Sequence, residues 1–179
     1  MRSTQQVSNI EQTSHIETVS SGIIAGAAGG LAEIAWVTLY ADATGCNASV
    51  LARGVTSAAG VGALLTESPV ILGVAVHMML AVTLGVALAY AWRKLRTRRF
   101  AATGPYPFML AALAGVWATN FFIILPIVSP AFVHMVPYAV SLTSKLLFGL
   151  AAAAALRWRT DREPTPKMNL ARLRCDKCR

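Results

Sequence analysis

The chain has 179 residues, of which 55% are hydrophobic and 13% are charged, and its mean hydropathy is +0.55. These values exclude an intrinsically disordered chain and are typical of a polytopic membrane protein, and the length leaves no room for a sizeable soluble domain. The formal net charge is +8. Beside apolar spans, basic clusters are topology signals, so no nucleic-acid partner is predicted.

Residues 1–21 are rich in Ser, Thr and Gln and lack apolar periodicity, which predicts a polar cytosolic tail with at most a short surface helix near residues 10–19. The first membrane span is predicted over residues 22–40, as an uncleaved signal anchor. Small residues recur along it at four-residue intervals, a spacing that lets a second helix approach closely. They are Gly22, Gly26 and Gly30. Glu33 continues this face and is therefore predicted to point into the bundle.

The first outer loop is predicted to contain an additional helix over residues 49–66. This segment is weakly amphipathic and has too many glycines and too few bulky apolar residues for a span. Such a segment is expected to lie in the membrane interface or to re-enter the bilayer.

Three more apolar runs, over residues 69–92, 106–128 and 131–156, are long enough to cross a bilayer. The second and fourth spans each follow a Ser-Pro pair, a capping hydroxyl with proline at the first helical position. Pro137 lies inside the fourth span and predicts a kink there. The sequence thus predicts an all-α integral membrane protein. It has a four-helix transmembrane domain over residues 22–157 and a basic cytosolic tail over 158–179.

Basic residues gather on one side of such a bundle. The N-terminal tail, the connection 93–99 and the segment from Arg157 contain every Lys and Arg except Arg53 and Lys145. By the positive-inside rule both termini are predicted to be cytosolic, in a multi-pass inner or cell membrane protein. The connection is predicted to meet anionic lipid through Arg93, Lys94, Arg96, Arg98 and Arg99.

A polar stripe runs along the fourth span. Offsets of four, seven and eleven residues place its members on one helical face. They are His134, Tyr138, Ser141 and Lys145. An ionisable residue in a membrane span is costly, so it is predicted to face the bundle interior or a wet cavity.

The other spans contribute one polar group each at a similar depth. Glu33, His77 and Asn120 are predicted to lie about 10–12 Å inside the outer boundary, from 1.5 Å of rise per residue. With the stripe they form a predicted polar column. Glu33 is the only acid in the spans, so it is the natural partner of Lys145. This network either stabilises the packing of the helices through hydrogen bonds or provides a path for protons, ions or a ligand.

Imidazole and thioether groups occur together twice, at His77-Met78 and at His134-Met135. This combination suits copper, and two histidines are also the axial ligands of a haem b, although methionine is equally a packing residue. Cys175 and Cys178 have metal or redox spacing but lack the second pair that a structural zinc site needs.

No nucleophile elbow, phosphate loop or H-E-x-x-H motif is present, so the sequence predicts a protein that is not an enzyme. Two functional classes remain. One is an accessory or structural subunit of a membrane complex, as a homo- or hetero-oligomer. The other is a small oligomeric transporter or channel that uses the polar column. A haem- or copper-binding membrane subunit is a further alternative.

Overall fold

The computed structural model describes residues 2–45, 69–96, 104–128 and 137–162, together with Val50, Arg53, Gly54, Thr56, Gly60 and Pro130. This part of the chain is almost entirely helical. Four stretches are long and apolar enough to cross a membrane, namely Ser14–Thr44, Val70–Leu95, Pro105–Val128 and Tyr138–Arg162. The prediction of four helices of membrane-spanning length and composition is therefore confirmed.

The first helix, α1 (Arg2–Thr44), begins well before the predicted start of its span at Gly22. It includes the segment that the sequence predicts as a tail. Residues 2–21 contain neither proline nor glycine. Extending an existing helix requires no new nucleation, so a polar sequence without helix breakers continues the helix that the apolar span begins. The sequence correctly predicts that this segment is polar. Its lack of apolar periodicity does not reveal that the segment is helical.

The second membrane-length helix, α3 (Pro69–Arg96), begins at the predicted proline and extends past the predicted end at Trp92. The segment 49–66, predicted as an interfacial helix, falls mostly outside the described residues and stays a prediction.

The third predicted span consists of three helical pieces, α4 (Pro105–Thr119), the π-helical turn η1 (Asn120–Ile124) and α5 (Leu125–Val128). The wider turn has a local cause in Pro126, which lies inside the continuing helix. Proline lacks an N–H donor, and in an α-helix its ring clashes with the carbonyl group four residues earlier, here that of Phe122. The π-helical turn relieves that clash, and the Leu125 N–H donates to the Asn120 carbonyl five residues back.

The last helix, α7 (Tyr138–Arg162), starts directly after Pro137 and continues beyond the predicted end at residue 156. Pro137 was predicted to kink the helix interior. Instead, its carbonyl oxygen accepts the N–H groups of Val140 and Ser141, at 3.0 and 3.1 Å, in the first turn. Proline suits this place because it has no donor to lose. Residues 131–136 lie outside the described part of the chain.

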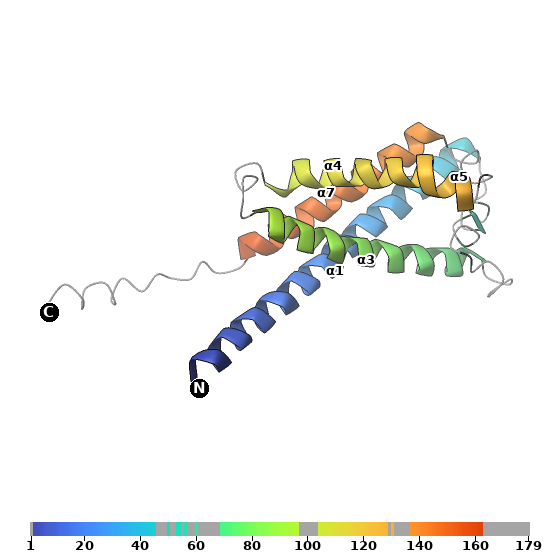
Figure 1. The fold of residues 1–179 in the computed structure, drawn as a ribbon. Helices are drawn as coiled ribbons and strands as arrows, with labels where there is room; N and C mark the ends of the chain where they lie inside the picture. Colours follow the sequence, from blue (N-terminus) through green and yellow to red (C-terminus); the bar gives the residue numbers. More distant parts are fainter. Residues whose placement is uncertain are drawn as a thin grey trace, which may run out of the picture.

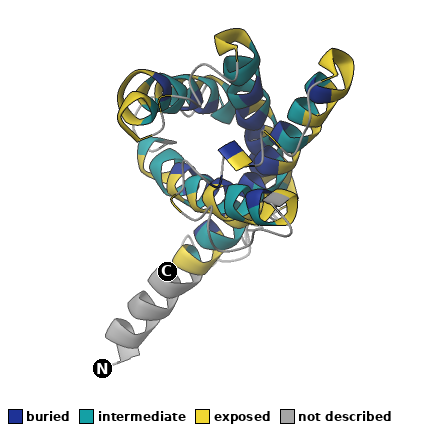
Figure 2. Ribbon diagram, turned by 90° about the vertical axis from the view of Figure 1, so that its right-hand side faces the viewer, coloured by how far each residue is buried: buried dark blue, intermediate teal, exposed yellow. Residues whose placement is uncertain are grey.

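The helices pack in the order α3, α1, α7, α4 (Figures 1 and 2). α1 packs against both α3 and α7, α4 packs against α7, and α3 and α4 touch only sparsely. Glycines allow the close crossing of α1 over α3. A Cβ atom added at Gly26 would lie 2.5 Å from the Ala81 carbonyl oxygen, and one at Gly22 would lie 2.5 Å from the Cα atom of Val86. The predicted small-residue stripe is thus the surface on which α3 rests.

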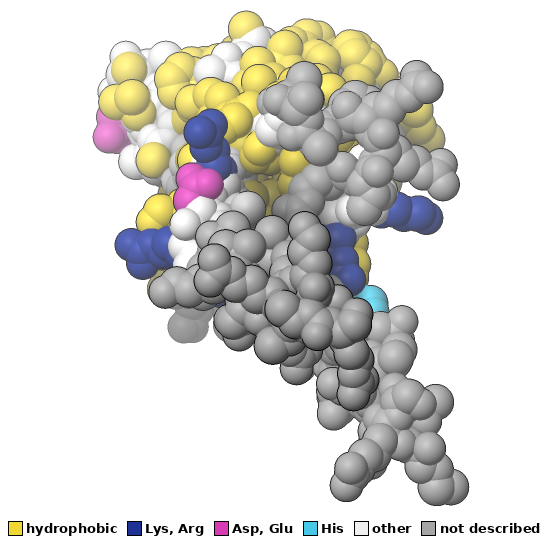
Figure 3. All heavy atoms as spheres, turned by 90° about the vertical axis from the view of Figure 1, so that its left-hand side faces the viewer, with side chains coloured by type: hydrophobic (Ala, Val, Ile, Leu, Met, Phe, Trp, Pro, Cys, Tyr) yellow, Lys and Arg dark blue, Asp and Glu magenta, His cyan; other side chains and the backbone are white. Residues whose placement is uncertain are grey.

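The hydrophobic core lies toward the end of the bundle where α3 and α7 finish and α4 begins. Its largest fully buried side chains are Met109, Leu113 and Phe148. Small residues fill the helix contacts around them, including Ala81 and Ala152. Figure 3 faces this end and shows Lys and Arg side chains around its rim, with hydrophobic side chains beyond them. The largest buried side chains therefore lie nearer to the basic end of the bundle than to the other end.

Candidate functional site

The centre of the candidate site is the carboxylate of Glu33, which α1 directs toward α7. The Glu33 residue is only 2% exposed. Lys145 Nζ lies 2.7 Å from Glu33 Oε1 and donates a hydrogen bond to Oε2 at 3.0 Å. Ser144 Oγ donates to Oε1 at 3.2 Å. The structure thus contains the Glu33–Lys145 pair that charge balance predicts, with Ser144 as an additional partner.

Packing on α1 places Glu33 in this position. One turn earlier, the ring of Phe148 lies against Gly29, where an added Cβ atom would lie 2.6 Å from Cδ1 of that ring. Gly30, on the adjoining face, lies against Met78 and Ala81 of α3. Because both neighbours approach α1 at glycines, the next turn brings the carboxylate between α3 and α7. A larger residue at Gly29 would hold α7 away and stretch the ion pair.

His77 approaches the same carboxylate from α3. Its Nε2 atom lies 3.4 Å from Glu33 Oε2, within ion-pair distance. The same Nε2 atom is buried and has no partner with hydrogen-bond geometry among the described residues. The contact is therefore electrostatic when the imidazole carries a proton, and it is a packing contact otherwise. Glu33 is thus bracketed by side chains from both neighbouring helices.

The cluster lies well inside the predicted spans. At 1.5 Å per residue, Lys145 is ~10 Å beyond the first residue of α7, and His77 is ~12 Å beyond the first residue of α3. Glu33 is ~16 Å before the end of α1. A hydrocarbon core is about 30 Å thick, so a lone charge here would be costly. The pair is neutral as a unit, which removes most of that cost.

Two other members of the predicted column, Ser141 and Tyr138, contact α4 and η1 instead of Glu33. Ser141 accepts a hydrogen bond from Trp117 Nε1 at 2.9 Å and donates to the Tyr138 carbonyl at 3.0 Å. The ring of Tyr138 packs against Trp117, Phe121 and Phe122 of α4 and η1. Asn120 is the first residue of η1 and is half-buried. The single polar column predicted from the sequence is therefore wrong for Ser141 and Tyr138, which join α7 to α4 through a hydrogen bond and ring contacts.

The division follows from the position of α7 between two neighbours. The residues that face α1 are Ser144, Lys145 and Phe148. Those that face α4 are Tyr138 and Ser141. Tyr138 and Lys145 are seven residues apart and therefore differ by only about 20° around the helix axis, so the stripe lies between the two neighbouring helices and its members contact one or the other. Trp36 of α1 adds a bond to α7, through Nε1 to the Val140 carbonyl at 3.1 Å.

The predicted metal ligands are not assembled in the described residues. His134 and Met135 lie outside them, as do Cys175 and Cys178. Met78 packs on Gly30, and no three His, Cys, Asp or Glu side chains converge anywhere in the described ranges. The predicted copper or haem site includes His134 and therefore stays a prediction.

The basic connection is described as far as Arg96. Arg93 donates to the Ser14 carbonyl at 2.7 Å and to Thr18 Oγ1 at 2.8 Å, which ties α3 to α1. Lys94 is exposed, and Arg98 and Arg99 lie outside the described residues. Arg159 makes a similar tie from α7, with both terminal nitrogens on Ser20 Oγ.

Sequence reasoning missed Ser144 and the partner surface of the glycine stripe. A signal for each was present. Ser144 adjoins the only lysine in the spans, and α3 has its own small residues at four-residue spacing in Ala81, Gly85 and Ala89. Matching two such stripes predicts a close helix crossing.

Comparisons of the chain with protein-family models, curated proteins and solved structures find no match.

Proposed function

We propose that this chain is a non-catalytic, multi-pass membrane protein that serves as a structural or accessory subunit of a membrane complex. The observation that carries the proposal is the state of Glu33. Its carboxylate is buried and engaged by Lys145 and Ser144 of the chain's own α7. An acid that binds a substrate needs a carboxylate oxygen that is accessible to it, whereas an acid that joins two helices needs partners on the neighbouring helix. The partners of Glu33 are on the neighbouring helix α7.

The remaining inter-helix bonds fit the same role. Arg93, Arg159 and Trp36 each join two helices through a hydrogen bond to a hydroxyl or carbonyl group. The outer end of η1 and α5 presents large apolar side chains, with Ile127 79% and Phe122 62% exposed. In a membrane this surface meets lipid or the apolar helices of another subunit. A rigid bundle with an apolar outer face is suited to assembly.

A second candidate function, as an oligomeric transporter or channel, is favoured by one observation. The Lys145 and His77 side chains are 23% and 25% exposed, whereas that of Glu33 is 3% exposed. The Lys145 and His77 side of the cluster thus reaches the bundle surface. An accessible charge inside a span requires water, a partner or lipid headgroups near it.

Purification separates the two functions. The tagged full-length chain is extracted from its own membrane in mild detergent and examined by native mass spectrometry. We expect a complex containing a partner of different sequence at fixed stoichiometry. A homo-oligomer that conducts ions in liposomes would overturn the subunit proposal, provided that the Glu33→Gln/Lys145→Leu double variant abolishes the flux.

The proposed orientation, with both termini cytosolic in the cell membrane, makes a labelling prediction. A variant that keeps only Cys46, two residues after the end of α1, is expected to react with a membrane-impermeant thiol reagent from outside the cell. A variant whose only cysteine is introduced at position 103, between α3 and α4, is expected to react only after the membrane is opened. Labelling of both positions from the same side would contradict four spans.

A further inference from the structure

Two exposed aromatic side chains lie near the two ends of α7. Tyr138, its first residue, is 49% exposed, and Trp158 is 50% exposed. At 1.5 Å of rise per residue they are about 30 Å apart along the helix, which is the thickness of a hydrocarbon core. Tyrosine and tryptophan are enriched at both membrane–water interfaces, because each combines an apolar ring with a polar group. The spacing is therefore that of two residues at opposite boundaries of one bilayer.

Charged residues become frequent at the level of Trp158. Between Tyr138 and Trp158, α7 has only two charged residues, Lys145, which is paired with Glu33, and Arg157, next to Trp158. α3 follows the same order, because it has no Asp, Glu, Lys or Arg before Trp92, and Arg93 follows directly. On both helices, a tryptophan thus lies where the apolar sequence gives way to arginine.

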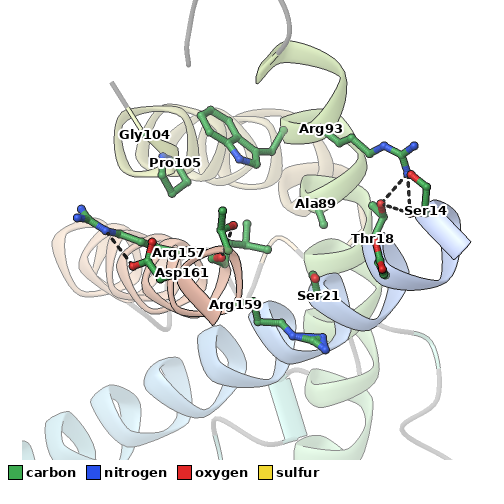
Figure 4. A pocket seen from close by; sticks show the side chains of 14 residues that line it. Ser14, Thr18, Ser21, Ala89, Arg93, Gly104, Pro105, Arg157, Arg159 and Asp161 are labelled. Atoms are coloured by element: carbon green, nitrogen blue, oxygen red, sulfur yellow. Dashed lines mark hydrogen bonds and ion pairs between the residues drawn. The ribbon is translucent and has the colours of Figure 1, made fainter. Parts of the chain in front are cut away.

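A pocket of about 440 Å³ lies between α1, α3, α4 and α7 at this basic end of the bundle (Figure 4). Its wall includes the acidic residues Glu17 and Asp161. Figure 4 shows that the guanidinium groups of Arg93, Arg157 and Arg159 extend away from the pocket. Ionised groups are costly in hydrocarbon, and arginines near helix ends direct their charge toward the headgroups. This end of the bundle is therefore suited to the headgroup region.

Arg162 gives Trp158 a cationic neighbour. Its Cζ atom lies 4.0 Å from the centroid of the Trp158 ring, so the guanidinium and the ring attract each other. Both residues are exposed, and so are Ala154 and Leu150, one and two turns earlier on the same side of α7. A guanidinium that contacts a ring through its flat face keeps its N–H donors for other groups. The pair thus presents an apolar ring and a cation on one outer surface.

We propose that Trp158 and Arg162 form an interfacial anchor for α7, a surface that contacts the phospholipids of the bilayer at the boundary between hydrocarbon and headgroups. The Trp158 ring lies at that boundary, and the Arg162 guanidinium donates to lipid phosphate oxygens beyond it. Arginine is suited to this contact because its fork of donors matches phosphate oxygens. The inference rests on membrane insertion and not on either proposed function.

The first measurement locates α7 in vesicles of dioleoyl-phosphatidylglycerol that contain the full-length protein. The three native cysteines are replaced by serine, and a nitroxide spin label is attached to Leu150→Cys, Ala154→Cys or Asp161→Cys. Electron paramagnetic resonance then compares the access of oxygen, which concentrates in hydrocarbon, with that of a water-soluble nickel complex. We expect oxygen to dominate at positions 150 and 154 and the nickel complex to dominate at position 161. The crossover then falls beside Trp158.

The second measurement tests the anchor with the label at position 161. Trp158→Leu is expected to move the label toward the hydrocarbon by about 1.5–3 Å, one to two residues of helical rise, because leucine enters hydrocarbon more readily than tryptophan. Arg162→Gln is expected to move it in the same direction. Trp158→Tyr keeps an interfacial ring and is the matched control, which is expected to leave the label in place. Because these side chains are exposed, unfolding of all three variants in detergent is expected to match that of the parent.

Three results would overturn the anchor. The first is a label at position 161 that is more accessible to oxygen, which would place the boundary beyond Trp158. The second is a label at position 154 or 161 that neither probe reaches, which would show that a protein and not lipid covers this face. The third is an equal position of the label in Trp158→Leu and Trp158→Tyr, which would show that the ring does not set the depth of α7.

Discussion

Lys145→Leu is expected to lower the free energy of unfolding in mild detergent by about 3–5 kcal/mol, because it leaves the Glu33 carboxylate buried without its counter-charge. Glu33→Gln is expected to cost less than Lys145→Leu. The Lys145 side chain is 23% exposed and Glu33 only 3%, so an unpaired lysine can reach the bundle surface whereas an unpaired glutamate cannot. Thermal or denaturant unfolding, followed by tryptophan fluorescence, measures both changes.

The double variant Glu33→Gln/Lys145→Leu is expected to recover much of the loss, because no uncompensated charge remains. Coupling in this cycle measures the pair directly. The control cycle combines Glu33→Gln with Arg162→Gln. Arg162→Gln removes an exposed charge from the C-terminal end of α7, the helix that contains Lys145. That cycle is expected to be additive within about 0.5 kcal/mol. Additivity in both cycles would show that Lys145 does not stabilise Glu33.

Gly26→Ala is expected to destabilise the bundle by about 1–3 kcal/mol, the usual cost of overpacking. The added methyl group would meet the backbone of α3, 2.5 Å from the Ala81 carbonyl oxygen and 2.7 Å from the Val82 Cα atom. Backbone atoms cannot rotate away as a flexible side chain can, so the two helices must separate. Unfolding in the same detergent measures the change.

Gly115→Ala is the matched control for this prediction. It introduces the same methyl group in a helix, but nothing lies within 4 Å of the new position. Alanine is a better helix former than glycine, so this variant is expected to be neutral or to gain up to about 0.5–1 kcal/mol. Equal effects at both positions would show that helix propensity, and not the close crossing of α1 and α3, determines the outcome.

The ion pair shows how much of the site the sequence could predict. The spans contain one acid, Glu33, and one central lysine, Lys145. Since a lone charge in hydrocarbon is costly, the pairing follows from charge balance alone. His77 belongs to the same cluster, whereas Ser141 and Tyr138 of the same predicted column contact α4. Depth depends on the residue count along one helix, whereas contact depends on which helices are neighbours.

The amino-acid sequence by itself determined that the chain has four helices of membrane length, that Glu33 needs a counter-charge, and that α1 offers a glycine face to a partner. Composition, charge and spacing within a single helix are sufficient for these conclusions. Only the tertiary structure decided the helix order α3, α1, α7, α4 and the pocket at the basic end. Both depend on how surfaces far apart in the sequence fit together, because each apolar helix has several faces that can pack equally well in isolation.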